Sequence, residues 1–168
     1  MRRGVFLYLL MSLSPVVTAA ESPSITLKAS SFYLGGGIGF NTASGGNGTG
    51  AQILGGYLFD FKLNGNISTA IELGYMNSGT FDVKNFNNDA TARVNDEAKG
   101  LWLNVVETFP IGNRVEGLVR LGFDFGDDDG LMAGTGLGYY FNTNWFLRSE
   151  YVVRDYVNSF QFNLLYNF

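Results

Sequence analysis

The 168-residue chain contains no cysteine and no histidine. Without cysteine it has no disulfide, although small exported domains commonly depend on disulfides for stability. Metal sites built from cysteine and histidine are excluded by the same composition. The absence of histidine also removes the base that most often activates a serine or threonine nucleophile. We therefore expect no cofactor, no metal site of this kind and no catalysis by a histidine-activated nucleophile.

Charged residues are also scarce. They make up 15% of the chain, and the formal net charge is -4 at pH 7. Because an acidic chain without a basic stripe is a poor partner for phosphates, nucleic-acid binding is not expected. The successive acids Asp127, Asp128 and Asp129 could attract Ca²⁺ or Mg²⁺. No complete calcium-loop pattern surrounds them, and a solvated turn is the simpler interpretation.

Long hydrophobic runs are missing after residue 20, where nothing approaches the roughly 20 apolar residues of a membrane helix. At the N-terminus, Arg2 and Arg3 precede an apolar run over residues 5–17 and three small residues. This order predicts a secretory signal peptide over residues 1–20 and a single domain over residues 21–168. A buried N-terminal helix is the alternative, but Pro15 would interrupt it. A protein exported without a helical anchor is either soluble or a closed barrel.

Glycine and aromatic residues are abundant, with 23 glycines, 15 phenylalanines and nine tyrosines. They occur in segments of about ten residues in which apolar side chains fill every second position, the pattern of β-strands. Turn or loop residues separate the segments. Eight segments follow this pattern, at residues 32–40, 51–59, 67–75, 101–109, 114–125, 131–141, 145–154 and 159–168.

The two faces of these segments differ in a way that favours a membrane. Leu121 and Phe123, for example, alternate with Arg120 and Asp124. A face of charged residues and glycine makes a poor protein core, whereas a soluble sandwich or lipocalin-like barrel needs a polar outer face. Aromatic residues also gather at the segment ends, as in the girdles of membrane barrels. We predict an all-β, eight-stranded antiparallel up-and-down transmembrane β-barrel.

The predicted connections alternate in length, as expected for external loops and periplasmic turns. The second long connection contains FDVKNFNN and TARVNDEAKG, which predict a hairpin extending past the membrane with residues 87–89 at its tip. It is the best candidate for a contact with a surface ligand. The longer connections are residues 41–50, 77–98, 125–130 and 155–158, and the shorter ones are 60–65, 110–113 and 142–144.

Taken in order, several segments resemble the transmembrane barrel of the OmpA-type outer-membrane proteins over residues 31–168. They are FYLGGGIGF, GAQILGGYLFD, AIELGY, GLWLNVVETFPI, VEGLVRLGF, GTGLGYYFNTNWFLRSEY and a last strand ending in Tyr-x-Phe. The resemblance implies a monomer in the outer membrane of a Gram-negative bacterium, in contact with lipid and lipopolysaccharide. It also implies recognition of Leu164, Tyr166 and Phe168 by the outer-membrane assembly machinery. The peptidoglycan-binding domain of larger members is not expected, since nothing follows Phe168.

Similar proteins hold ion pairs inside the barrel, and the matching positions here are Glu72, Arg120, Arg148 and Glu150. Two further charges of the family are absent, because Val106 and Gly138 occupy their places. The resemblance therefore implies simple pairing of acids and bases and not a switchable gate. From burial alone, Glu116 and Arg154 should join the same mutual hydrogen bonding.

Three features of the pattern have no single interpretation. Leu165 breaks the polar character of the inner face without an evident reason. Glu107 points at lipid by strict alternation, so it lies at the rim or on a bulge that turns it inward. The many inward glycines would leave voids along one side of the lumen, which keeps open a narrow pore for ions or small solutes.

We predict a non-enzymatic barrel with a structural or surface-interaction role, because an eight-stranded barrel is just wide enough for its own side chains. The narrow pore is the alternative. A lipid-modifying barrel enzyme is less favoured, because no serine and acid are placed convincingly as nucleophile and base.

Overall fold

The computed structural model describes residues 31–43, 46–63, 66–84, 91–94 and 97–168. The expected signal peptide, the Asn64-Gly65 turn and the expected hairpin tip at residues 87–89 lie outside the described residues. No helix in the described part of the chain is long and apolar enough to cross a membrane.

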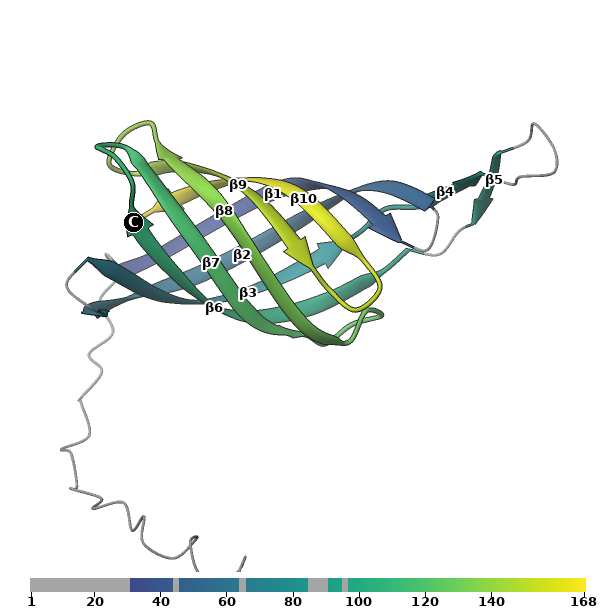
Figure 1. Ribbon diagram of the computed structural model, residues 1–168, viewed down its shortest axis with the longest axis horizontal. Coiled ribbons are helices and arrows are strands. Elements are labelled where there is room, and N and C mark those ends of the chain that lie inside the picture. Colours follow the sequence, from purple (N-terminus) through teal and green to yellow (C-terminus); the bar gives the residue numbers. More distant parts are fainter. Residues whose placement is uncertain (1–30, 44–45, 64–65, 85–90, 95–96) are drawn as a thin grey trace, which may run out of the picture.

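Eight of the ten strands form one closed antiparallel barrel, so the predicted fold class is confirmed (Figure 1). The order around the barrel is β1-β10-β9-β8-β7-β6-β3-β2, and β2 pairs with β1 to close it. Its strands are β1 (Phe32–Ala43), β2 (Gly46–Leu63), β3 (Ile67–Asn77), β6 (Lys99–Pro110), β7 (Val115–Asp124), β8 (Gly130–Tyr140), β9 (Trp145–Val153) and β10 (Asn158–Asn167). The other two, β4 (Phe81–Lys84) and β5 (Thr91–Val94), form a hairpin beyond one end.

Closure follows from the register between the first and last strands. β1 and β10 share ten residue pairs, from Tyr33 opposite Asn167 to Thr42 opposite Asn158. Because all ten residues of β10 and ten of the twelve residues of β1 are paired, the first and last strands leave no open edge in the membrane. The period-two pattern then places apolar side chains outward on every barrel strand, for example Leu34, Ile53 and Leu121, each more than half exposed.

The first predicted loop, residues 41–50, is wrong. β1 continues to Ala43 and β2 begins at Gly46, with Asn41 opposite Gly48 and Thr42 opposite Asn47. Glycine is depleted in strands, so the sequence alone predicts a loop here. In the structure this segment is a strand, and its glycines leave room for the chain that packs against it. A Cβ atom on Gly48 would lie 2.9 Å from the backbone oxygen of Thr80, so a chain segment that follows β3 passes directly over it.

The β4–β5 hairpin extends beyond the end of the barrel at which β1 connects to β2, as Figure 1 shows. β4 pairs with the first residues of β2, Gly46 opposite Val83 and Asn47 opposite Asp82. The predicted hairpin within residues 77–98 is therefore present. It projects from the end of the barrel opposite the C-terminus.

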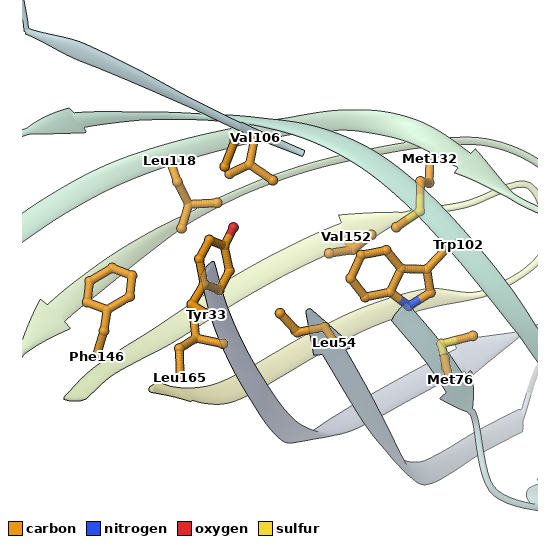
Figure 2. Packing of buried hydrophobic residues seen from close by; sticks show 11 residues of the cluster. Tyr33, Leu54, Met76, Trp102, Val106, Leu118, Met132, Phe146, Val152 and Leu165 are labelled. Carbon is orange, nitrogen blue, oxygen red and sulfur yellow. The ribbon is translucent and has the colours of Figure 1, made fainter. Parts of the chain in front are cut away.

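The buried apolar side chains inside the barrel belong to one cluster, in which two groups lie at different heights (Figure 2). One group lies toward the short turns and contains Tyr33, Val106, Leu118, Phe146 and Leu165. The other lies toward the long loops and contains Leu54, Met76, Trp102, Met132 and Val152. Together they make the lumen a packed core at both ends, as expected for eight strands.

Large side chains occupy the space in front of several inward glycines, so the expected voids are absent there. An added Cβ atom at each of these glycines would overlap a side chain of an adjacent strand. The pairing also explains Leu165, which fills the space that Gly35 leaves. The pairs are Gly35 with Leu165, Gly37 with Asn163, Gly74 with Trp102, Gly122 with Asn104 and Gly138 with Phe146.

Candidate functional site

Four charged side chains from three strands meet in the middle of the lumen. Arg120 Nη2 lies 2.8 Å from Glu72 Oε2 and 2.9 Å from Glu150 Oε2. Arg148 pairs with Glu72 through Nη1 and with Glu150 through Nε at 2.9 Å. None of the four residues is more than 3% exposed. We call Glu72, Arg120, Arg148 and Glu150 the charge quartet. Its two acids and two bases balance, which buried charges require.

Neutral side chains supply further hydrogen bonds to the quartet. The Tyr33 hydroxyl donates to Glu72 Oε1 at 2.6 Å, and Asn163 Nδ2 donates to Glu150 Oε1 at 2.9 Å. Gln52 Nε2 in turn donates to Asn163 Oδ1 at 2.6 Å. Each carboxylate is thus held by both arginines and by a neutral donor, which offsets much of its desolvation. Alternation places Tyr33 on the inner face, but it gives no sign that Tyr33 is a partner of Glu72.

A second ion pair closes the lumen at the loop end. Arg154 Nε donates to Asp124 Oδ2 at 3.1 Å, and Arg154 Nη1 donates to Ser159 Oγ at 3.1 Å. Ser159 donates to Asn41 Oδ1, and Asn41 Nδ2 donates to the carbonyl oxygen of Ser78 at 2.8 Å. The chain of contacts joins strands from both sides of the barrel. Alternation also places Asp124 on the inner face, but it does not show that Asp124 is the partner of Arg154.

Glu116 and Arg154 do not join the charge quartet, so that part of the expectation is wrong. Glu116 lies toward the turn end and accepts a hydrogen bond from the Tyr140 hydroxyl at 3.3 Å. Along their strands, Glu116 is four residues from Arg120 and Arg154 is four from Glu150. Since two strand residues span about 7 Å, each lies too far along the strand to reach the quartet directly.

The turn end of the lumen contains a small cavity. Its volume is about 60 Å³, and the residues that line it include Tyr33, Glu116 and Arg148. It has room for a few water molecules. On the loop side of the quartet, the Arg120 guanidinium lies over the Trp102 ring, 5.3 Å from its centroid. Side chains therefore cover the charge quartet on both sides.

The sequence matches the family model of the outer membrane protein β-barrel domain over residues 6–168. The chain belongs to this family. The protein is therefore located in the outer membrane of a Gram-negative bacterium, as predicted. No curated protein sequence matches it.

Solved membrane barrels have the same fold at low sequence identity. A de novo designed transmembrane β-barrel has a TM-score of 0.54 at 16% identity, covering 84% of this chain and 98% of the design. Neisserial surface protein A gives 0.52 at 13%, covering 82% and 97%. The outer-membrane protein Ail of Yersinia pestis, in a phospholipid bilayer nanodisc, gives 0.52 at 14%, covering 81% and 99%.

Outer-membrane barrels have short turns on the periplasmic side and longer loops outside. The charge quartet thus lies between a periplasmic apolar layer and an external one, and the β4–β5 hairpin lies outside the cell. The acidic loop is external too. Asp128 accepts hydrogen bonds from the backbone amides of Tyr156 and Val157 at 2.8 and 2.9 Å, and Asp127 accepts one from Lys99. No group of three or more metal-ligating acids occurs among the described residues.

Glu107 faces the membrane without a bulge in β6, whose pairing with β3 is regular. It is half-buried on the outer wall, three residues before the end of the strand at Pro110. The Thr69 hydroxyl, directly across on β3, lies 2.9 and 3.0 Å from its two carboxylate oxygens. Of the two predicted positions for Glu107, the rim and an inward-turning bulge, the structure shows the rim.

The predicted assembly residues lie on the outer wall at the periplasmic end. Leu164 and Tyr166 point outward from β10, and the Phe168 amide donates to the carbonyl oxygen of Phe32 at 3.1 Å. The Phe168 ring packs edge-on against Tyr166, with centroids 5.3 Å apart. Their recognition during assembly stays a prediction, because contacts in the folded barrel do not test it.

Proposed function

We propose that the barrel is a closed, non-enzymatic scaffold that presents the external β4–β5 hairpin to a partner outside the cell. The observation that carries the proposal is the contrast between the two parts. The lumen is occupied by the charge quartet and two apolar layers, whereas the hairpin extends freely past the barrel end (Figure 1). Binding functions commonly lie on loops that a rigid scaffold positions.

A narrow pore is less well supported, because several of the inward glycines are covered by side chains of adjacent strands. A lipid-modifying enzyme is also less well supported. The chain has no histidine, and Ser159, a buried hydroxyl of the lumen, contacts an arginine and an amide and no base.

Replacing residues 81–94 with a short glycine-serine linker should abolish surface binding while the barrel still folds. Within the described residues, two residue pairs join β4 to β2, so the barrel loses little pairing. Wild-type protein in nanodiscs, tested on arrays of host-surface glycans and matrix proteins, should bind at least one class of target. The shortened variant should bind none of these targets.

The matched control replaces the external residues 126–129 with the same linker, and this variant should keep wild-type binding. Heat-modifiable gel mobility would report folding of all three proteins. Binding that survives removal of the hairpin, or a wild-type protein that binds nothing on either array, would contradict the proposal.

A further inference from the structure

Two apolar grooves meet on the membrane-facing wall around Gly55. Their volumes are about 510 and 420 Å³, and they share Leu34, Gly55 and Leu73. One extends toward the periplasmic end, where Phe168 lines it, and the other extends to Tyr75. Because the grooves share these residues, they form a single furrow along β1, β2, β3 and β6. We call it the Gly55 furrow.

The furrow exists because an outward position carries no side chain. Gly55 lies between Leu34 on β1 and Leu73 on β3, its direct cross-strand neighbours. A Cβ atom added there would come within 3.1 Å of one Leu34 methyl group, and otherwise only the Tyr33 carbonyl oxygen lies within 4 Å. A larger side chain at residue 55 would thus point into the furrow, with only a flexible leucine to displace.

Glu107 lies just beyond the furrow on its periplasmic side and does not itself line either groove. It is opposite Thr69, and the next outward residue of β3 is Ile71, which lines the furrow. Two residues along a strand span about 7 Å, so the carboxylate is within the reach of a lipid headgroup whose chain lies in the furrow. No ion pair among the described residues includes Glu107, whose carboxylate contacts the Thr69 hydroxyl.

We propose that Glu107 and the Gly55 furrow bind a phospholipid with a protonated amine headgroup from the periplasmic leaflet. The ammonium group donates a charge-assisted hydrogen bond to the Glu107 carboxylate, and Thr69 orients that carboxylate. One acyl chain lies in the furrow. Because lipid tails are as apolar as the wall, the chain gains packing and no hydrophobic energy. Selectivity therefore comes from the charge pair, and the furrow sets the position.

The occupant follows from charge and depth. An acid on a membrane-facing wall is unfavourable unless a cation or water neutralises it, and an amine headgroup supplies a cation at this level. A phosphatidylglycerol headgroup has no cation, and the phosphatidylcholine cation has no hydrogen to donate. The site should therefore rank ethanolamine lipids above both.

Native mass spectrometry of the full chain, released from micelles doped with each dioleoyl lipid, tests this ranking. Phosphatidylethanolamine should be retained about fivefold more than phosphatidylcholine or phosphatidylglycerol, as for an ion pair of about 1 kcal/mol. Glu107→Gln should reduce phosphatidylethanolamine retention to the level of phosphatidylcholine, leave phosphatidylcholine retention unchanged and not lower that of phosphatidylglycerol, whose anionic headgroup the carboxylate repels. Gly55→Leu should reduce retention of all three.

The matched control for the second variant is Ala133→Leu, which adds a similar volume to an exposed outward position on β8, across the barrel. It should retain lipid as the wild type does. Ile71→Phe fills the furrow from a different strand and serves if Gly55→Leu does not fold. Equal retention of the three lipids by wild type, no effect of Glu107→Gln, or a second copy of the chain in place of lipid would overturn the proposal.

Discussion

Replacing Glu72 with alanine should lower the free energy of unfolding by about 3–5 kcal/mol, the loss expected when one partner of a buried ion pair is removed. Glu72 accepts hydrogen bonds from Tyr33, Arg120 and Arg148. Without it, two buried guanidinium groups share the single carboxylate of Glu150. Urea unfolding of the barrel in lipid vesicles, followed by tryptophan fluorescence, would measure the change.

A charge-balanced double variant distinguishes the cost of an unpaired buried charge from the cost of lost side-chain packing. In Glu72→Leu/Arg148→Leu the remaining Arg120 and Glu150 still pair, at 2.9 Å in the native structure. Replacement of both partners by apolar groups is often nearly neutral, so most of the lost stability should return. A single Glu72→Ala variant within about 0.5 kcal/mol of wild type would show that the quartet does not hold buried charges.

Replacing Gly74 with valine should also destabilise the barrel, by about 3 kcal/mol, the upper end of the usual cost of overpacking. A Cβ atom at residue 74 would overlap the Trp102 ring and would lie 2.8 Å from the carbonyl oxygen of Ile53. Neither can move freely, because Trp102 is fully buried and Ile53 belongs to the paired strand β2. The same urea titration measures the loss.

The Trp102→Ala change supplies the control for this steric explanation. Combined with Gly74→Val, it gives the valine methyl groups the space that the indole occupied. The double variant should therefore be less destabilised than the sum of the two single variants. Strict additivity would mean that Trp102 does not fill the space in front of Gly74.

The strands and their facing were predictable from the sequence because both depend on local periodicity. In residues 114–125, alternation alone put Arg120 and Asp124 inward and Leu121 and Phe123 outward, and the structure agrees. The prediction of a loop at residues 41–50 was wrong for the opposite reason. The glycines and asparagines of this segment have low strand propensity, and only pairing between β1 and β2 shows that they are extended.

Contacts across the lumen were less predictable, because they depend on how the strands are staggered around the barrel. Alternation identifies an inward charge and does not say which inward charge lies at the same height. Arg154 therefore pairs with Asp124, which is distant in the sequence, and not with Glu150, which is only four residues away. Leu165 was unexplained for a related reason. Leu165 fills the space that the absent side chain of Gly35 leaves. The two residues become neighbours only when the last strand pairs with the first.

Single-channel recording in planar bilayers tests the closed lumen most directly. The purified full-length barrel, inserted in symmetrical potassium chloride, should give no reproducible unitary current steps. This result is expected because the charge quartet and both apolar layers occupy the lumen. Reproducible steps from the wild-type protein that disappear in Arg148→Ala would contradict a closed scaffold and would favour a narrow pore through the barrel.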